Sequence, residues 1–178
     1  MTPKVGQTAP RIDADAYVRG VANPRRITTH ELSGRWTVLF FYPRDFTFVC
    51  PTELAGFAEL TEAFEEEDAT IVAASTDSYF SHIAWFESHR MLAGVDYPVL
   101  ADTAHDLAGA YGVLTEDGSA LRGTFLIDPE GVLRYASVSD QSVGRSPGEV
   151  LRILQALRTG ELCPVNWRPG QPTLAIAA

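Results

Sequence analysis

The chain has almost no cysteine: only Cys50 and Cys163 occur among its 178 residues. They form no CxxC pair, and two thiols are too few for a disulfide scaffold. Four histidines are scattered along the chain without the spacing of zinc ligands: His30, His82, His89 and His105. We therefore predict neither a structural metal site nor a bound cofactor.

Basic charge and long apolar runs are also scarce. The formal net charge is −9, which disfavours nucleic acid and anionic membranes as partners, because phosphate groups attract basic surfaces. No apolar run approaches the ~20 residues of a membrane span, and the N-terminal residues lack the apolar core of a secretory signal. The sequence thus predicts a soluble cytoplasmic protein, and its length fits one domain whose core needs no disulfide.

Hydrophobic periodicity predicts alternating strands and helices. Strands are expected at 36–43, 70–76 and 97–102, followed by a hairpin at 124–138 whose turn is Pro129–Gly131. Helices are expected at 50–66, 78–90, near 103–112 and at 146–159. In the second of these helices we expect four residues to face inward: Phe80, Ile83, Ala84 and Phe86. In the last, Ser146 and Glu149 have the spacing of a capping box.

This order of elements predicts an α/β layer fold with a mixed central sheet flanked by helices. Beyond Gly160 the chain is proline-rich and irregular, and this segment contains Cys163. We expect one domain at 1–160, followed by a C-terminal tail at 161–178 that is not a second domain.

The stretch FYPRDFTFVCPTEL, residues 41–54, places Cys50 between a buried strand and the start of a helix. Cys50 is either a small buried hydrophobe, as most single cysteines are, or a reactive thiolate. Free N–H groups in a first helical turn favour negative charge, and Pro51 suits that turn. Thr47 could aim its hydroxyl at the sulfur or at an oxygen bound beside it, and Pro43 could shield the pocket and fix the loop. The combination favours the reactive thiolate.

The same stretch resembles the signature of the typical two-cysteine peroxiredoxins, which include the C subunit of alkyl hydroperoxide reductase. Pro43, Thr47 and Cys50 match the family pattern of proline, three residues, threonine, two residues and cysteine. Further counterparts occur in the family's order, at DSYFSHIAW (77–85), RGTFLIDPEGVLR (122–134), SVGRSPGEVLRIL (142–154) and GELCPVNWRPG (160–170). The resemblance therefore covers nearly the whole chain and implies a thioredoxin-like fold.

The resemblance also implies roles for single residues. Cys50 corresponds to the peroxidatic cysteine, which becomes a sulfenic acid. Arg122 corresponds to the active-site arginine that stabilises the thiolate and holds the peroxide. Glu53 and Arg145 match a carboxylate and a second arginine that order the site, although an ordinary surface ion pair is the alternative. Trp85 matches an aromatic position near the pocket, but a tryptophan on a helix face is usually part of the core.

For Cys163, the resemblance implies the resolving thiol, which attacks the Cys50 sulfenic acid of the neighbouring subunit. That implies an antiparallel homodimer, and relatives often assemble five dimers into a decameric ring. The implied substrates are hydrogen peroxide and organic hydroperoxides, and a thioredoxin-like protein or a flavoprotein would reduce the disulfide. Relatives that are easily overoxidised carry a Gly-Gly-Leu-Gly insertion and a C-terminal helix with a Tyr-Phe pair. This chain has only Met91–Asp96 and a short proline-rich tail there.

Two other classes of function are considered. A thiol-disulfide oxidoreductase of thioredoxin type is disfavoured by the missing CxxC, because that chemistry needs two thiols in one turn. A ring-forming, chaperone-like assembly with a peroxide-sensing role is the remaining alternative.

Overall fold

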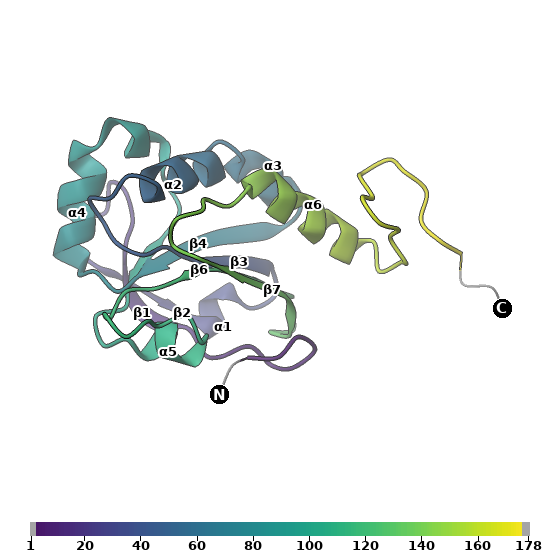
Figure 1. Ribbon diagram of the computed structural model, residues 1–178, viewed down its shortest axis with the longest axis horizontal. Coiled ribbons are helices and arrows are strands. Elements are labelled where there is room, and N and C mark those ends of the chain that lie inside the picture. Colours follow the sequence, from purple (N-terminus) through teal and green to yellow (C-terminus); the bar gives the residue numbers. More distant parts are fainter. Residues whose placement is uncertain (1–2, 176–178) are drawn as a thin grey trace.

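The computed structural model describes residues 3–175 and contains one seven-stranded sheet (Figure 1). The strands are β1 (Asp13–Tyr17), β2 (Arg25–Thr28), β3 (Trp36–Phe41), β4 (Ala69–Ser75), β5 (Val99–Ala101), β6 (Arg122–Ile127) and β7 (Leu133–Ser139). Their order across the sheet is β2-β1-β5-β4-β3-β6-β7. The pairs β3–β4 and β4–β5 are parallel and the others are antiparallel. The predicted mixed sheet is confirmed.

Helices cover both faces of this sheet. They are α1 (Thr29–Leu32), α2 (Cys50–Ala58), α3 (Thr61–Glu66), α4 (Tyr79–Ser88), the 3₁₀ helix η1 (Arg90–Gly94), α5 (Asp106–Ala110) and α6 (Pro147–Arg158). Figure 1 shows α2, α3, α4 and α6 on one face and α1 and α5 on the other. None of the helices within residues 3–175 has the length and apolar character needed to cross a membrane.

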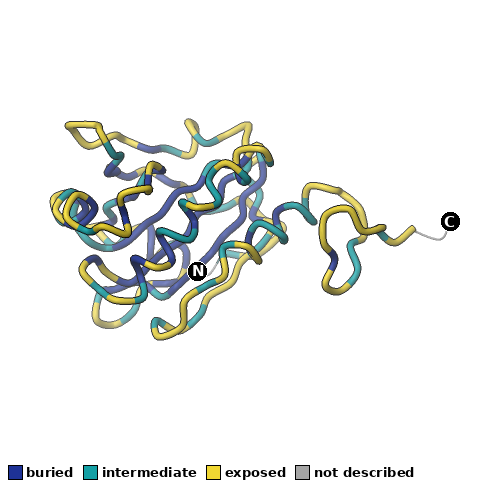
Figure 2. Tube along the Cα trace, turned by 90° about the horizontal axis from the view of Figure 1, so that it is seen from above, coloured by how far each residue is buried: buried dark blue, intermediate teal, exposed yellow. Residues whose placement is uncertain are grey.

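The central strand β3 is buried on both faces, as its continuous apolar sequence predicts. Val38 and Phe40 pack into the core beneath α2 and α6, and Leu39 and Phe41 pack into the core beside α5. Figure 2 shows this continuous buried centre in dark blue. The end of β3 leads directly into the loop before Cys50, so a rigid strand anchors that loop.

The N-terminal hairpin of β1 and β2 is absent from the sequence prediction. In β1 the exposed positions Asp13 and Asp15 alternate with the buried positions Ala14 and Ala16. Alanine is small and is not typical of strands, so the alternation is easily overlooked. The pairing of β1 with β5 extends the sheet on the side away from β6 and β7.

The prediction of one helix over 50–66 is wrong, because the structure contains two helices there. The N–H of Leu60 donates to the carbonyl of Phe57 at 3.1 Å, a three-residue closure typical of a helix end. Leu60 itself has φ −110° and ψ 9°, outside the helical region. Helix α3 then begins at Thr61, and Phe57 and Phe64 are both still buried.

The predicted inward face of α4 is only partly correct. Phe80 is 77% exposed and Ala84 is exposed. The buried residues of this helix are Tyr79, His82, Trp85 and Phe86. The sequence of α4 therefore offers two possible inward faces, and the face that is buried is the one that contains His82. Burying this face places His82 next to Asp45.

The predicted hairpin and the predicted helix after it are both present in the structure, but the capping box is not. The hairpin of β6 and β7 forms, and the Ser146 hydroxyl accepts from the Glu149 N–H at 3.3 Å at the start of α6. The Glu149 carboxylate pairs with Arg152 at 2.7 Å, so it does not complete a capping box. Beyond α6 the chain runs in turns and projects from the body, mostly exposed (Figures 1 and 2). Residues 176–178 of the predicted tail lie outside the described residues.

Candidate active site

Cys50 is the first residue of α2, where the sequence places it. Pro51 follows in the first turn. Proline lacks a main-chain N–H, and this costs no hydrogen bond there because the N–H groups of a first helical turn have no partner within the helix. The Cys50 side chain is fully buried, which by itself agrees with a filler residue. Its surroundings do not, because a guanidinium group from β6 lies against the sulfur.

That guanidinium belongs to Arg122, the first residue of β6, which is only 3% exposed. Arg122 Nη1 lies 3.5 Å from Cys50 Sγ and also donates to Glu53 Oε2. Arg122 Nε donates to the carbonyl of Gln141 at 2.8 Å, which fixes the plane of the group. A buried cation therefore lies within hydrogen-bonding distance of the sulfur.

Glu53, one turn after Cys50 on α2, binds both arginines of the site. Its carboxylate accepts from the Arg145 main-chain N–H at 2.7 Å, from Arg145 Nε at 2.8 Å and from Arg145 Nη2 at 2.9 Å. Burial raises the pKa of Glu53, but the hydrogen bonds and charge of Arg145, with the charge of Arg122, hold it below its ordinary value. Glu53 is therefore a buried carboxylate at neutral pH.

Arg145 links this network to the sheet. Its Nη1 donates to the Gly123 carbonyl at 2.7 Å, and its guanidinium carbon lies 5.1 Å from the centre of the Phe40 ring. The side chains of Glu53 and Arg145 are 1% and 9% exposed. The alternative of an ordinary surface ion pair is therefore wrong, because the pair is buried against β3 and β6.

The loop between β3 and α2 contains the other predicted residues. Pro43 is buried, and the Thr47 hydroxyl donates to the Arg44 carbonyl at 2.8 Å instead of to the Cys50 sulfur. Trp85 is 1% exposed, and its ring centre lies 6.1 Å from that of Tyr42 and 6.0 Å from that of Phe46. Trp85 is thus a core residue that also supports this loop from behind.

The structure brings Cys50, Glu53, Arg122 and Arg145 together, but it leaves Cys163 elsewhere. Cys163 lies in the tail beyond α6, where its Sγ is 3.6 Å from the Ala156 carbonyl oxygen and 3.4 Å from Thr159 Oγ1. In Figure 1 that tail extends away from the body that holds α2. Both cysteines are free thiols.

Sequence reasoning missed two buried groups next to the loop. Asp45, inside the signature stretch, is 6% exposed, and His82 on α4 is fully buried. The available signal was a charged residue within the otherwise apolar and aromatic run that precedes Cys50. Nothing in the sequence indicated that His82 would be its partner.

Comparisons with known proteins place the chain in a family. A family model described as the AhpC/TSA family matches residues 5–136, and a model described as the C-terminal domain of 1-Cys peroxiredoxin matches residues 156–177. The chain is 46% identical to a putative peroxiredoxin of Bacillus subtilis, YkuU, over 96% of this chain and 97% of that protein. It is 42% identical to the alkyl hydroperoxide reductase C of Mycolicibacterium smegmatis, over 98% and 88% of the two chains.

Solved structures of the same family are also similar to this chain. The reduced 2-Cys peroxiredoxin of Plasmodium vivax aligns with a TM-score of 0.90 and 32% identity, over 95% of this chain and 91% of that chain. AhpC of Mycobacterium tuberculosis aligns with a TM-score of 0.86 and 40% identity, over 94% and 100%. These alignments confirm the thioredoxin-like fold predicted from the sequence. The chain therefore belongs to the AhpC/TSA family as a typical two-cysteine peroxiredoxin, a thiol peroxidase that reduces hydroperoxides.

Proposed function

We propose that Cys50 is the residue that attacks the peroxide. Its thiolate attacks one peroxide oxygen, a sulfur–oxygen bond forms, and the oxygen–oxygen bond breaks. The leaving oxygen takes up a proton and departs as water or an alcohol, so the sulfur is oxidised to a sulfenic acid and the peroxide is reduced. The substrates are hydrogen peroxide and organic hydroperoxides.

One observation carries this assignment: a buried arginine lies against a cysteine sulfur at a helix N-terminus. Arg122 Nη1, 3.5 Å from Cys50 Sγ, favours the thiolate and is placed to stabilise the negative charge that develops on the leaving oxygen. The Glu53 carboxylate and the Gln141 carbonyl hold the guanidinium in this position. Arg145 in turn holds Glu53, so both are supporting residues. Pro43 shields the pocket around Cys50, and Thr47 is part of the loop between β3 and α2.

We further propose that Cys163 of a second subunit resolves the sulfenic acid. The Cys163 thiol attacks the oxidised sulfur of Cys50, a disulfide forms, and the sulfenic oxygen leaves as water. The position of Cys163 in a projecting tail supports a partner in trans. Residues 161–178 then act as an arm on the peroxidase domain at 1–160. A dithiol of a thioredoxin-like protein or a flavoprotein returns both thiols with two electrons.

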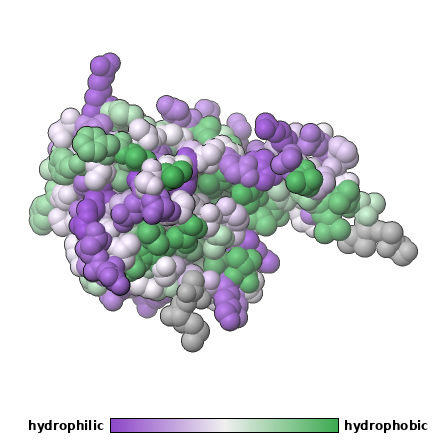
Figure 3. All heavy atoms as spheres, viewed as in Figure 1, coloured by the Kyte–Doolittle hydropathy of each residue, from purple (hydrophilic) through white to green (hydrophobic). Residues whose placement is uncertain are grey.

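Two surfaces support the antiparallel homodimer. Strand β7 is the edge of the sheet, and most of its residues are exposed, including Val138 at 47%. Such an edge is available for pairing with a second copy. Figure 3 shows apolar side chains on the surface of the tail, where Val165 is 89% exposed and Leu174 is 55% exposed. Apolar surface of this kind is typical of a protein interface.

The decameric assembly is part of the same proposal. Exposed aromatic side chains on the active-site loop and on α4 support it, because large exposed apolar groups are typical of interaction sites. These are Phe46, Phe48 and Phe80, exposed at 61%, 94% and 77%. The low cysteine content of the sequence supports a reducing compartment such as the cytoplasm as the place of action.

The test is peroxide consumption by the wild type and by Cys50→Ser and Cys163→Ser variants, with dithiothreitol as reductant. We expect Cys50→Ser to lose turnover. Peroxide-treated wild type should run as a disulfide-linked dimer on a non-reducing denaturing gel, and Cys163→Ser should lose that band while Cys50 is still oxidised. Unchanged turnover in Cys50→Ser would refute the assignment, and an intramolecular disulfide would refute resolution in trans.

A further inference from the structure

Gln141 holds Arg122 through its main chain, and its own side chain is held in turn. Strand β7 lies beside β6 (Figure 1), with Ser139 opposite Arg122, so Gln141 follows two residues after this pair. Arg122 Nε donates to the Gln141 carbonyl at 2.8 Å. A guanidinium is planar and rigid, so this hydrogen bond also sets the direction in which Nη1 points toward Cys50.

The Gln141 side chain reaches back to the chain segment before β6. Its Nε2 donates to the Ser119 hydroxyl at 2.7 Å and to the Ala120 carbonyl at 3.1 Å. Because a carbonyl only accepts, the amide nitrogen and not the amide oxygen must face it, and the two contacts use both amide hydrogens. Ser119 is 1% exposed and Gln141 is partly buried, so the contact with the hydroxyl is largely shielded from water.

The Ser119 hydroxyl continues this series of hydrogen bonds to a carboxylate. It accepts from Gln141 and donates its single hydrogen to Asp117 Oδ1. The Ser119 main-chain N–H donates to the same oxygen at 3.0 Å. Hydrogen bonds from Ser119 and Thr115 hold the pKa of Asp117 below its ordinary value, so Asp117 is a carboxylate at neutral pH. The donors therefore point one way, from Gln141 through Ser119 to Asp117, and each bond polarises the next.

The turn that contains Asp117 also contacts the loop before Cys50. Arg44, on that loop, donates from Nη2 to the Asp117 carbonyl at 2.9 Å, and the same nitrogen lies 3.6 Å from Asp117 Oδ2. The two side chains are 45% and 66% exposed, so this ion pair adds little to stability. A variant of Asp117 would disturb the loop as well as Gln141, whereas a variant of Gln141 or Ser119 tests one contact alone.

The polar side chains of Ser119 and Gln141 are not needed merely to fill space. Two apolar side chains of similar shape would be close to neutral for stability, because a hydrogen bond between protein groups replaces one with water. What the pair supplies beyond packing is direction, since a hydrogen bond favours one orientation of the groups that it joins. Here it orients the main chain of Gln141, which contains the acceptor of Arg122 Nε.

We propose that Gln141 is a positioning residue for Arg122 in the reaction with peroxide. Its side chain, held by Ser119 and the Ala120 carbonyl, fixes the direction of its own main-chain carbonyl. That carbonyl holds Arg122 Nε and so keeps Nη1 directed at the Cys50 sulfur. The proposal rests on the proposed role of Cys50. Gln141 acts only through the arginine, so losing its side chain slows the oxidation of Cys50 without removing a group that reacts.

The first test is stopped-flow measurement of the oxidation of Cys50 by hydrogen peroxide. Gln141→Leu keeps the main-chain carbonyl and the approximate size of the side chain but removes both amide donors. It should slow the oxidation by roughly 10-fold, because small misplacements of reacting groups have effects of this size. Ser119→Ala removes one of the two acceptors and should slow it by roughly 5-fold, the equivalent of one hydrogen bond. The matched control is Gln155→Leu on α6, whose amide donates to the Glu67 carboxylate at 3.1 Å, and it should keep the wild-type rate.

The second test separates positioning from a purely structural role. A structural defect would slow the oxidation whether or not Arg122 is present. In an Arg122→Ala background, Gln141→Leu should therefore change the rate by less than about twofold, because its effect passes through the arginine. The double variant of Gln141→Leu and Ser119→Ala should be no slower than Gln141→Leu alone, since the two side chains act as a unit.

These outcomes distinguish the positioning role from the assignment of Cys50. If Cys50→Ser keeps its turnover, that assignment fails, whatever Gln141 does. If Cys50 carries the reaction but folded Gln141→Leu protein keeps the wild-type rate, the positioning role fails. Equal slowing by Gln141→Leu with and without Arg122 would also overturn it. Circular dichroism shows whether each variant is folded, and if Gln141→Leu is not, Ser119→Ala decides the same comparison because it removes a single hydroxyl.

Discussion

At the scale of single residues, Arg122 is the side chain on which the reactivity of Cys50 depends most directly. Replacing Arg122 with Ala should slow peroxide reduction by about 100-fold, typical of losing one key electrostatic donor. Stopped-flow measurement of the first oxidation of Cys50 checks this. Arg122→Lys should recover little, because an ammonium group lacks the planar fork that reaches Cys50, Glu53 and the Gln141 carbonyl together.

A matched control for this prediction is Arg35→Ala. Arg35 is half exposed and pairs with Asp68 on the surface, away from β6. Its loss should leave the oxidation rate unchanged. If Arg122→Lys reacted as fast as the wild type, the positive charge alone would account for the effect and the fork geometry would be irrelevant.

Glu53 makes a second residue-scale prediction, about pH and stability. Its folded pKa is held below the ordinary value of 4.5, so its contribution to stability is present above about pH 4.5 and is lost as the pH falls through the folded pKa. Glu53→Gln should lower the free energy of unfolding at pH 7 by about 3–5 kcal/mol, because two buried arginines lose their carboxylate. Urea unfolding between pH 7 and pH 3 measures both effects.

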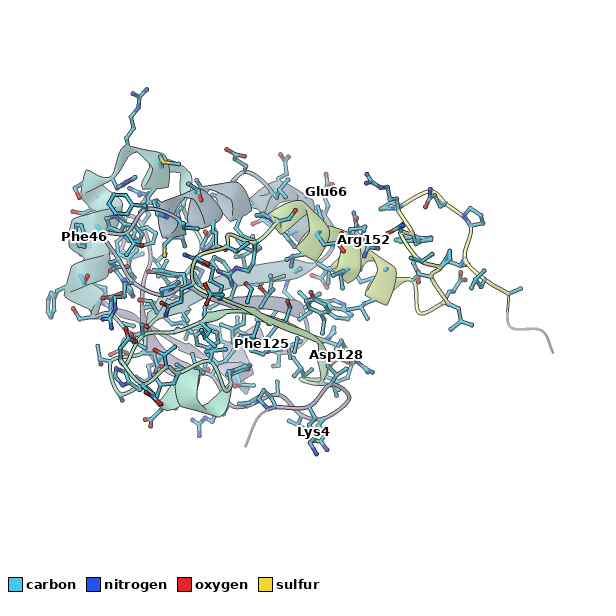
Figure 4. All side chains as sticks on the ribbon, viewed as in Figure 1. Lys4, Phe46, Glu66, Phe125, Asp128 and Arg152 are labelled. Carbon is cyan, nitrogen blue, oxygen red and sulfur yellow. The ribbon has the colours of Figure 1, made fainter. Side chains whose placement is uncertain are left out.

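The control is Glu66→Gln, since Glu66 is an exposed residue of α3 (Figure 4). That variant should follow the wild-type stability curve. The Glu53→Gln variant should instead lose less stability than the wild type as the pH falls below about 4.5, because the group that would be protonated is gone. Parallel curves for Glu53→Gln and the wild type would contradict this account of the site.

The site residues differ in how far the sequence could predict them. Cys50 and Pro51 follow from local rules for a helix start, and the structure places both there. Arg122 lies 72 positions from Cys50, so only the family resemblance pointed to it. The sequence did not indicate that the Thr47 hydroxyl would donate to the Arg44 carbonyl, because the pattern of residues does not reveal such a local acceptor.

At the scale of elements, β6 must pass very close to its neighbours in order to present Arg122. A Cβ atom added at Gly123 would lie 2.7 Å from Val113 Cγ1 and 2.8 Å from Phe125 Cε2. Gly123→Ala should therefore destabilise the protein by about 1–3 kcal/mol through overpacking. It should also slow peroxide reduction, because β6 carries Arg122 at the adjacent position. Denaturant midpoints and oxidation rates measure the two effects.

Gly148→Ala is the comparison for that variant. Gly148 lies in the first turn of α6, and a Cβ added there would have no heavy atom within 4 Å. It should be neutral or slightly stabilising, because alanine suits a helix better than glycine. An equally stable Gly123→Ala protein would mean that β6 and the Val113 side chain adjust without penalty.

The elements themselves were predicted well where one physical signal dominates. The continuous apolar run of β3 and the turn residues between β6 and β7 each specify a single structure. The sequence was ambiguous where two signals compete, as in α4, whose buried stripe is decided by the contact between His82 and Asp45. The hairpin of β1 and β2 was missed because its buried residues are mainly alanine, which contributes little apolar signal.

At the scale of the whole molecule, the two cysteines lie near opposite ends of α6. The network of Cys50, Glu53, Arg122 and Arg145 lies near the N-terminal end of α6. At the other end, the Arg152 side chain donates to the Trp167 carbonyl at 2.8 Å and so ties the Cys163 segment to α6 (Figure 4 labels Arg152). In the proposed dimer, a subunit contributes its active site to one reaction and its tail to the partner's.

This arrangement predicts resistance to overoxidation. The elements that the family resemblance associates with sensitivity are a loop insertion and a helix after the resolving cysteine. Here the loop is the five-residue 3₁₀ helix η1, and the tail from Gly160 to residue 175 contains turns but no helix. With no such helix over α2 in the described part of the tail, Cys50 should leave its pocket readily and meet Cys163 before a second peroxide reaches the sulfenic acid.

We therefore expect wild-type protein to keep turning over at peroxide concentrations that inactivate sensitive relatives. Mass spectrometry of Cys50 after turnover at rising peroxide should find mainly the disulfide, with little sulfinic acid. Cys163→Ser is the positive control and should form sulfinic acid at low peroxide, because its sulfenic acid has no resolving thiol. Abundant sulfinic acid in the wild type at low peroxide would show that some other contact holds α2 closed. The contact to test first would then be the Tyr97 hydroxyl, which donates to the Leu54 carbonyl in the middle of α2 at 2.7 Å.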